Sequence, residues 1–220
     1  MLTSLLTKHQ SIFNTVVPFN AEDDRLLLMD FTKDNKAITA EVIADNAIFS
    51  AYINNQLSKN NSKYGIGGYN EDRTFYSRSK SFDGENGKEP RRLHLGIDIW
   101  GAADTPVFAP VGGMVHSFAY NGDYGDYGAT IILLHQLDGM AFYTLYGHLS
   151  LKDIAPLQEG QYINRGEEFA HFGEEPDAKI RAAKLDEGLA VLTGLWANAP
   201  FSFAGEHFQV KQVHMPPAAG

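Results

Sequence analysis

The sequence contains no cysteine, and this absence excludes several kinds of structure and chemistry. Without thiols the chain can form neither a disulfide nor a metal site built on thiolate ligands. A cysteine nucleophile is excluded for the same reason. Any bound zinc would therefore have to be held by histidine and carboxylate side chains, and the sequence offers eight histidines and 27 acidic residues for this.

Basic charge and long apolar runs are also scarce. The formal net charge is −9, which disfavours binding to nucleic acid or to an anionic lipid surface. Apolar runs such as residues 131–134 are far too short to span a membrane, so we expect no transmembrane segment. Residues 1–19 lack the basic and continuous apolar regions of a signal peptide, so we expect no export signal there.

With 44% hydrophobic and 20% charged residues, the composition is typical of a folded globular protein. We expect an N-terminal extension over residues 1–90, a β-rich core over 91–175 and an atypical C-terminal tail over 176–220. One helix is predicted at about 38–58, because apolar residues recur there at helical spacing. These residues are Ile38, Val42, Phe49, Ile53 and Leu57.

The pattern from residue 94 to 172 predicts a mostly β fold with a twisted antiparallel sheet, because short apolar runs alternate with glycine-containing turns. Two runs joined through Leu137-Asp138-Gly139 predict a hairpin. In its second strand, period two places Phe142, Thr144, Tyr146 and His148 on one face. The stretch 178–196 is Ala-rich and permits a helix, and the residues after it have a strand-like pattern.

His94 and Asp98 combine two good zinc ligands, an imidazole and a carboxylate. In a fully extended strand this spacing would separate the two Cα atoms by roughly 13 Å, too far for one ion. The chain must therefore bend between them, and Gly96 is the residue where a bend costs least. The alternative is that Asp98, in an apolar stretch, pairs with Arg91 or Arg92.

Five sequence blocks in series resemble the lysostaphin/LytM-type zinc endopeptidases over about residues 90–175. The blocks are RRLHLGIDIW, TPVFAPVGGMVHSFAY, DYGATIILLHQ, FYTLYGHLS and LQEGQYINRGEEFAHFGE. The resemblance implies a LytM-like β domain of the duplicated-hybrid type. It also implies that His94 and Asp98 are zinc ligands and that His148 assists catalysis.

That family also uses a later His-x-His, which supplies a third ligand and a second catalytic histidine, and this sequence has none. His207, in GEHFQV, resembles the last part of that block and would then be the third ligand, with Gly205 in place of the other histidine. Alternatively, His207 is an unrelated strand histidine. A further alternative is a change of reading frame, because codons for residues 199–205 can give Pro-His-Phe-His-Leu-Gln when read one base later.

The resemblance implies a zinc-dependent endopeptidase that cleaves peptidoglycan cross-bridges with a metal-activated water. Its cofactor would be Zn²⁺ and its substrate a peptidoglycan peptide, at the cell envelope or outside the cell. Without His-x-His, we expect the activity of this chain to be impaired. One alternative is a non-catalytic LytM-like module that binds peptidoglycan or regulates a partner hydrolase. Another is a small β-rich binding domain without metal.

Overall fold

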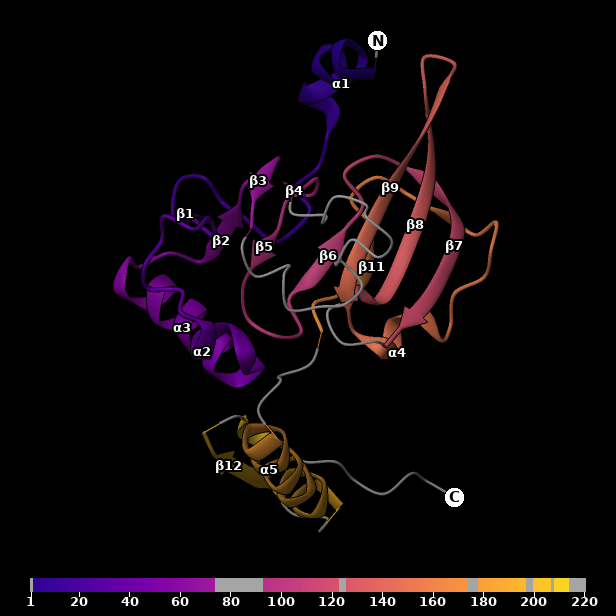
Figure 1. Cartoon of the computed structure of the whole chain (residues 1–220). Coiled ribbons are helices and arrows are strands. Elements are labelled where there is room, and N and C mark those ends of the chain that lie inside the picture. The colour runs from indigo at the N-terminus through magenta and orange to yellow at the C-terminus, as the bar shows by residue number, and fades with distance from the viewer. Residues whose placement is uncertain are drawn as a thin grey trace, which may run out of the picture. The chain divides into compact units, whose positions relative to one another are not determined.

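The computed structural model describes residues 2–73, 93–122, 126–173, 178–196, 200–206 and 208–213 (Figure 1). Packing contacts divide the chain into two compact units, Met1–Glu174 and Glu175–Gly220. The first unit contains the strands expected from the sequence motifs, together with the N-terminal helices.

A four-stranded antiparallel sheet in the first unit has the order β10-β7-β8-β9; Figure 1 shows β7, β8 and β9 side by side. Its strands are β7 (Gly113–Asn121), β8 (Gly128–Leu137), β9 (Met140–Leu149) and β10 (Tyr162–Ile163). A two-stranded antiparallel pair, β6 (Pro106–Phe108) with β11 (Glu168–His171), contributes to the same core. The expectation of a mostly β fold with an antiparallel sheet is confirmed.

The core of this unit is apolar, and its burial supplies the main driving force for folding. Its buried members are Val107, Ala109, Val115, Ala129, Ile131, Leu133, Leu149, Ile163, Phe169 and Ala170. Ile131 and Leu133 are fully buried and alternate along β8, as period two requires for a strand with one face on a core.

The predicted hairpin is present, with β8 and β9 joined by Asp138 and Gly139. Both turn residues have positive φ, 47° and 81°. Two-residue hairpin turns of this kind need positive φ at both positions, which explains the Asp-Gly pair. Leu137 pairs with Met140 across the turn, so the register is fixed from this end.

The other end of the hairpin contains a β-bulge, and this changes the expected placement of His148. Ala129 pairs with Leu149 and Ile131 with Tyr146, so two residues of β9 oppose one of β8. His148 lies in the bulge with a φ of 55°. The alternation therefore ends at Tyr146, and Leu149 rather than His148 continues the buried side of the strand.

The N-terminal region adds a second, three-stranded sheet in the order β1-β2-β5. β1 (Leu26–Met29) and β2 (Tyr64–Gly67) are parallel, and β5 (Ile99–Trp100) is antiparallel to β2. Parallel neighbours need a long crossover, which the helices α2 (Ala40–Ala44) and α3 (Asn46–Lys59) provide. The extension therefore shares a sheet with the strand that follows Asp98.

The single helix expected over 38–58 is two helices, because the chain leaves helical geometry at Asp45. This residue is extended (φ −123°, ψ 123°), and its carboxylate accepts hydrogen bonds from the Ala47 and Ile48 amides at 2.7 and 3.1 Å. Such a cap starts a new helix. The helix α1 (Leu2–His9) and the 3-10 turn η1 (Gln10–Ile12) were not expected from the sequence.

Short elements complete the described structure. In the first unit they are β3 (Glu71–Asp72), β4 (Leu93–His94) and α4 (Leu151–Ile154). The second unit has α5 (Ala178–Trp196) and a hairpin of β12 (Phe201–Ala204) and β13 (Gln209–Val213), so the expected helix and strands of the tail are confirmed. Among the described residues, no helix is both long and apolar enough to cross a membrane.

We expect Asp45→Ala to lower the free energy of unfolding by about 1 kcal/mol, because it removes the cap that starts α3. Ile53 and Leu57 of that helix pack in the core of the N-terminal sheet, so the loss should be transmitted to this part of the fold. Urea unfolding followed by circular dichroism measures it. Asp34→Ala, at an exposed position, is the control, and equal stability of the two variants would contradict the assignment.

Candidate metal centre

His94 and Asp98 lie on either side of a bend, and their side chains point toward each other. β4 ends at His94, the chain bends at Gly96 as expected, and β5 begins just after Asp98. The His94 Nε2 atom is 3.4 Å from Asp98 Oδ1. Zn–N and Zn–O bonds of about 2 Å in a tetrahedral site place neighbouring donor atoms roughly 3–4 Å apart. The pair therefore has the spacing of two ligands of one ion.

The other ring nitrogen of His94 determines which form of the imidazole fits this geometry. His94 Nδ1 is 3.3 Å from the carbonyl oxygen of Gly68. A carbonyl can only accept, so Nδ1 carries the proton in this contact, and in neutral imidazole the lone pair is then on Nε2. Two acceptor atoms, Nε2 and Asp98 Oδ1, then face each other. Either a proton or a metal cation between them removes the repulsion.

A guanidinium holds the second oxygen of Asp98. Arg73 is buried, with 2% of its surface exposed, and its Nη1 donates to Asp98 Oδ2. The alternative partners that the sequence offered for Asp98, Arg91 and Arg92, lie outside the described residues. Arg73 was not identified from the sequence, because it is 25 positions from Asp98 and no spacing rule connects the two.

His148 lies close enough to this pair for its charge to interact with both members. Its backbone amide donates to the Tyr127 carbonyl at 2.6 Å, which fixes the bulge. The side chain keeps contact with solvent, but the protein packed around it lowers the pKa of His148 from its ordinary 6.5 by desolvation. Asp98 and Asp126 raise this pKa, and His94 lowers it further.

The third expected ligand, His207, lies outside the described residues. Its neighbours belong to the second unit, where the Glu206 and Phe208 amides donate to the Glu187 carboxylate at 2.9 and 3.0 Å. In the part of the chain that is described, no group of three or more His, Cys, Asp or Glu side chains is arranged to hold a metal ion. His94 and Asp98 thus fit two positions of such a site, and the third stays a prediction.

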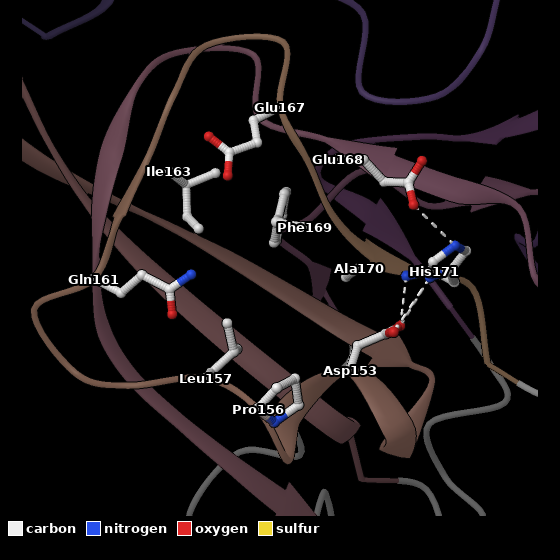
Figure 2. A pocket seen from close by; sticks show the side chains of 10 residues that line it. All are labelled: Asp153, Pro156, Leu157, Gln161, Ile163, Glu167, Glu168, Phe169, Ala170 and His171. Carbon is white, nitrogen blue, oxygen red and sulfur yellow. Dashed lines mark hydrogen bonds and ion pairs between the residues drawn. The ribbon is translucent and has the colours of Figure 1, made fainter. Parts of the chain in front are cut away.

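A pocket of about 260 Å³ lies elsewhere in the first unit, between α4 and β11 (Figure 2). None of the expected site residues lines it. His171, at its edge, has Nδ1 3.2 Å from Asp153 and Nε2 3.2 Å from Glu168. Both ring nitrogens therefore face carboxylates of the scaffold, and we assign His171 a structural role.

We expect the pKa of His148 in the metal-free protein to be below 6.5, because desolvation is the largest effect on it. As the pH falls below 6.5, the unfolded chain takes up a proton that folded His148 still excludes, so this residue lowers stability in acid. NMR titration of the ring measures the pKa. His148→Gln should lessen the loss of stability between pH 6.5 and the folded pKa, and a pKa above 6.5 would contradict the interpretation.

Comparison with known proteins agrees with the motifs. Residues 92–185 match the model of Peptidase family M23. No curated protein and no solved structure matches the chain. The matched segment contains His94, Asp98 and His148, and the family suggests a function of the peptidoglycan-hydrolase type. Residues 92–185 therefore resemble peptidase family M23, the LytM/lysostaphin-type family that the sequence motifs indicate.

Proposed function

We propose that this protein is a zinc-dependent endopeptidase of the peptidoglycan-hydrolase type, impaired in the present chain. The observation that carries the proposal is the opposed pair within the family segment, His94 Nε2 and Asp98 Oδ1, 3.4 Å apart. A third ligand is needed for a catalytic site of this kind, and His207 is the candidate. The family supplies the substrate class, a peptide cross-bridge of peptidoglycan.

The residues around the pair suit the chemistry of peptide hydrolysis. A zinc ion, when bound, lowers the pKa of its water toward 7. His148 has a lowered pKa, so its imidazole is neutral at pH 7 and can accept a proton on a ring nitrogen. The charges of Asp98 and Asp126 favour the resulting imidazolium. His148 can then return the proton to the leaving amine.

The missing His-x-His limits this activity in two ways. The family's second catalytic histidine has no counterpart, since Gly205 occupies the matching position when His207 is aligned as the ligand. Loss of one general acid or base typically costs about 10²–10⁴ in rate. If His207 is instead an unrelated strand histidine, the site keeps only two of its three protein ligands and binds zinc weakly.

The same absence favours a second candidate function, a non-catalytic LytM-like module that binds peptidoglycan or regulates a partner hydrolase. Such a module needs the sheet and the surface around it but no activated water. Co-sedimentation with purified peptidoglycan, combined with an assay for released peptides, separates the two functions. Binding without turnover would favour the module, and turnover would favour the enzyme.

His94→Ala and Asp98→Asn should each abolish stoichiometric zinc binding, whereas His148→Ala should retain it and lose any hydrolysis. The reason is that the first two remove donor atoms and the third removes only a proton acceptor. Zinc content after dialysis and peptide release measure the two effects. His116→Ala, at an exposed position on β7, is the matched control. If His148→Ala lost the metal, its assigned role would be wrong.

Zinc-loaded protein of this sequence should clear cell walls barely above a metal-free control, because the second catalytic histidine is absent. Turbidity of a wall suspension, with and without a chelator, measures the rate. Robust clearing that disappears with the chelator would contradict the impairment. Residues of the tail, His207 and His214 first, would then be the groups to test.

A further inference from the structure

The segment from Gly67 to Arg73 precedes the family segment, yet it contacts both residues of the opposed pair. The Gly68 carbonyl lies 3.3 Å from His94 Nδ1, and Arg73 donates to Asp98 Oδ2. β3 also pairs with β4, with Glu71 opposite His94. Residues that precede the segment 92–185 therefore contact the other polar atom of each side chain, His94 Nδ1 and Asp98 Oδ2.

The guanidinium of Arg73 is itself fixed on two further sides. Its Nε donates to Glu71 Oε2 at 2.6 Å, and its Cζ lies 5.2 Å from the ring centroid of Phe31. The other oxygen of Glu71 accepts from the Phe31 amide at 2.9 Å, and Phe31 has none of its surface exposed. The guanidinium therefore has little freedom to leave Asp98.

We propose that Arg73 is a positioning residue for Asp98 as a metal ligand. By holding Oδ2, the guanidinium directs Oδ1 toward His94 Nε2, so that the carboxylate offers one oxygen to a divalent cation. This inference rests on the proposed function, and it gives a role to a residue outside the family segment. Partners that orient a metal ligand in this way typically change metal affinity by 10–100-fold.

A positive charge beside a metal site also repels the metal, so Arg73 has two opposing effects on zinc affinity. Glu71 lies 2.6 Å from Arg73, so its negative charge offsets part of this repulsion. The orientation of the carboxylate is then the larger effect. Removing the orientation should weaken binding, although it also removes a cation.

Gly67 provides a way to disturb this contact without changing any charge. A Cβ at residue 67 would lie 2.8 Å from Arg73 Nη2 and 3.2 Å from Asp98 Cβ, so the guanidinium or the carboxylate would have to move. Gly67→Ala therefore tests the contact between Arg73 and Asp98 independently of Arg73→Lys.

The test compares zinc affinity, by competition with a chromophoric chelator, in full-length parent, Arg73→Lys, Gly67→Ala and a control. The control is Arg165→Lys, at an exposed arginine that donates to the Ile12 carbonyl. Arg73→Lys and Gly67→Ala should bind zinc about 10–100-fold more weakly. The control should stay within about twofold of the parent, since it changes neither candidate ligand nor its partners.

A second readout distinguishes positioning from a general loss of stability. The visible spectrum of the Co²⁺-loaded protein reports ligand geometry, and it should change in Arg73→Lys and Gly67→Ala but not in Arg165→Lys. Thermal melting of the metal-free proteins shows which variants fold. If Arg73→Lys does not fold, the zinc affinity of Gly67→Ala tests the positioning role.

The outcomes separate this inference from the proposed function. If the parent binds zinc and both variants bind it equally well, the positioning role is wrong and the proposed metal site stands. Tighter binding by Arg73→Lys would also overturn it, because Arg73 would then compete with the metal. A parent that binds no zinc would contradict the proposed metal site and the positioning role together.

Discussion

The ion pair between Arg73 and Asp98 is the interaction on which the rest of the candidate site depends. A carboxylate in a partly buried position is costly unless it is paired, and here a buried guanidinium satisfies one of its two oxygens. The other oxygen is thereby directed to His94. Because Arg73 is held by Glu71, and Glu71 by the Phe31 amide, the geometry of the two candidate ligands depends on residues of the N-terminal region.

Local patterns predicted much of the fold, and the failures have physical reasons. The Asp138-Gly139 turn and the alternation of β8 are local, so the hairpin followed from them. The break at Asp45 depends on a cap that competes with continued helix, and hydrophobic spacing alone does not reveal it. The bulge at His148 depends on a hydrogen bond from its amide to the Tyr127 carbonyl. The alternation of side chains along a single strand does not predict such a contact.

In the candidate site, too, contacts between residues close in sequence could be predicted, and contacts between distant residues could not. His94, Gly96 and Asp98 are neighbours in sequence, so a bend between two possible ligands could be argued from spacing. Arg73 reaches Asp98 only because β3 pairs with β4 and β2 with β5. Nothing in a single sequence marks Arg73 among the arginines as a partner of Asp98.

The ligands proposed for the metal site belong to different parts of this chain, so substitutions can remove one of them without the others. The opposed pair and its supports come from residues 67–98, within the first compact unit, whereas the third ligand would come from the second. The sheet of the first unit owes its stability to an apolar core that contains none of the candidate ligands. Loss of His-x-His therefore removes little folding energy, and selection for catalysis alone would preserve it. The fold of the first unit therefore does not depend on the residues proposed for catalysis.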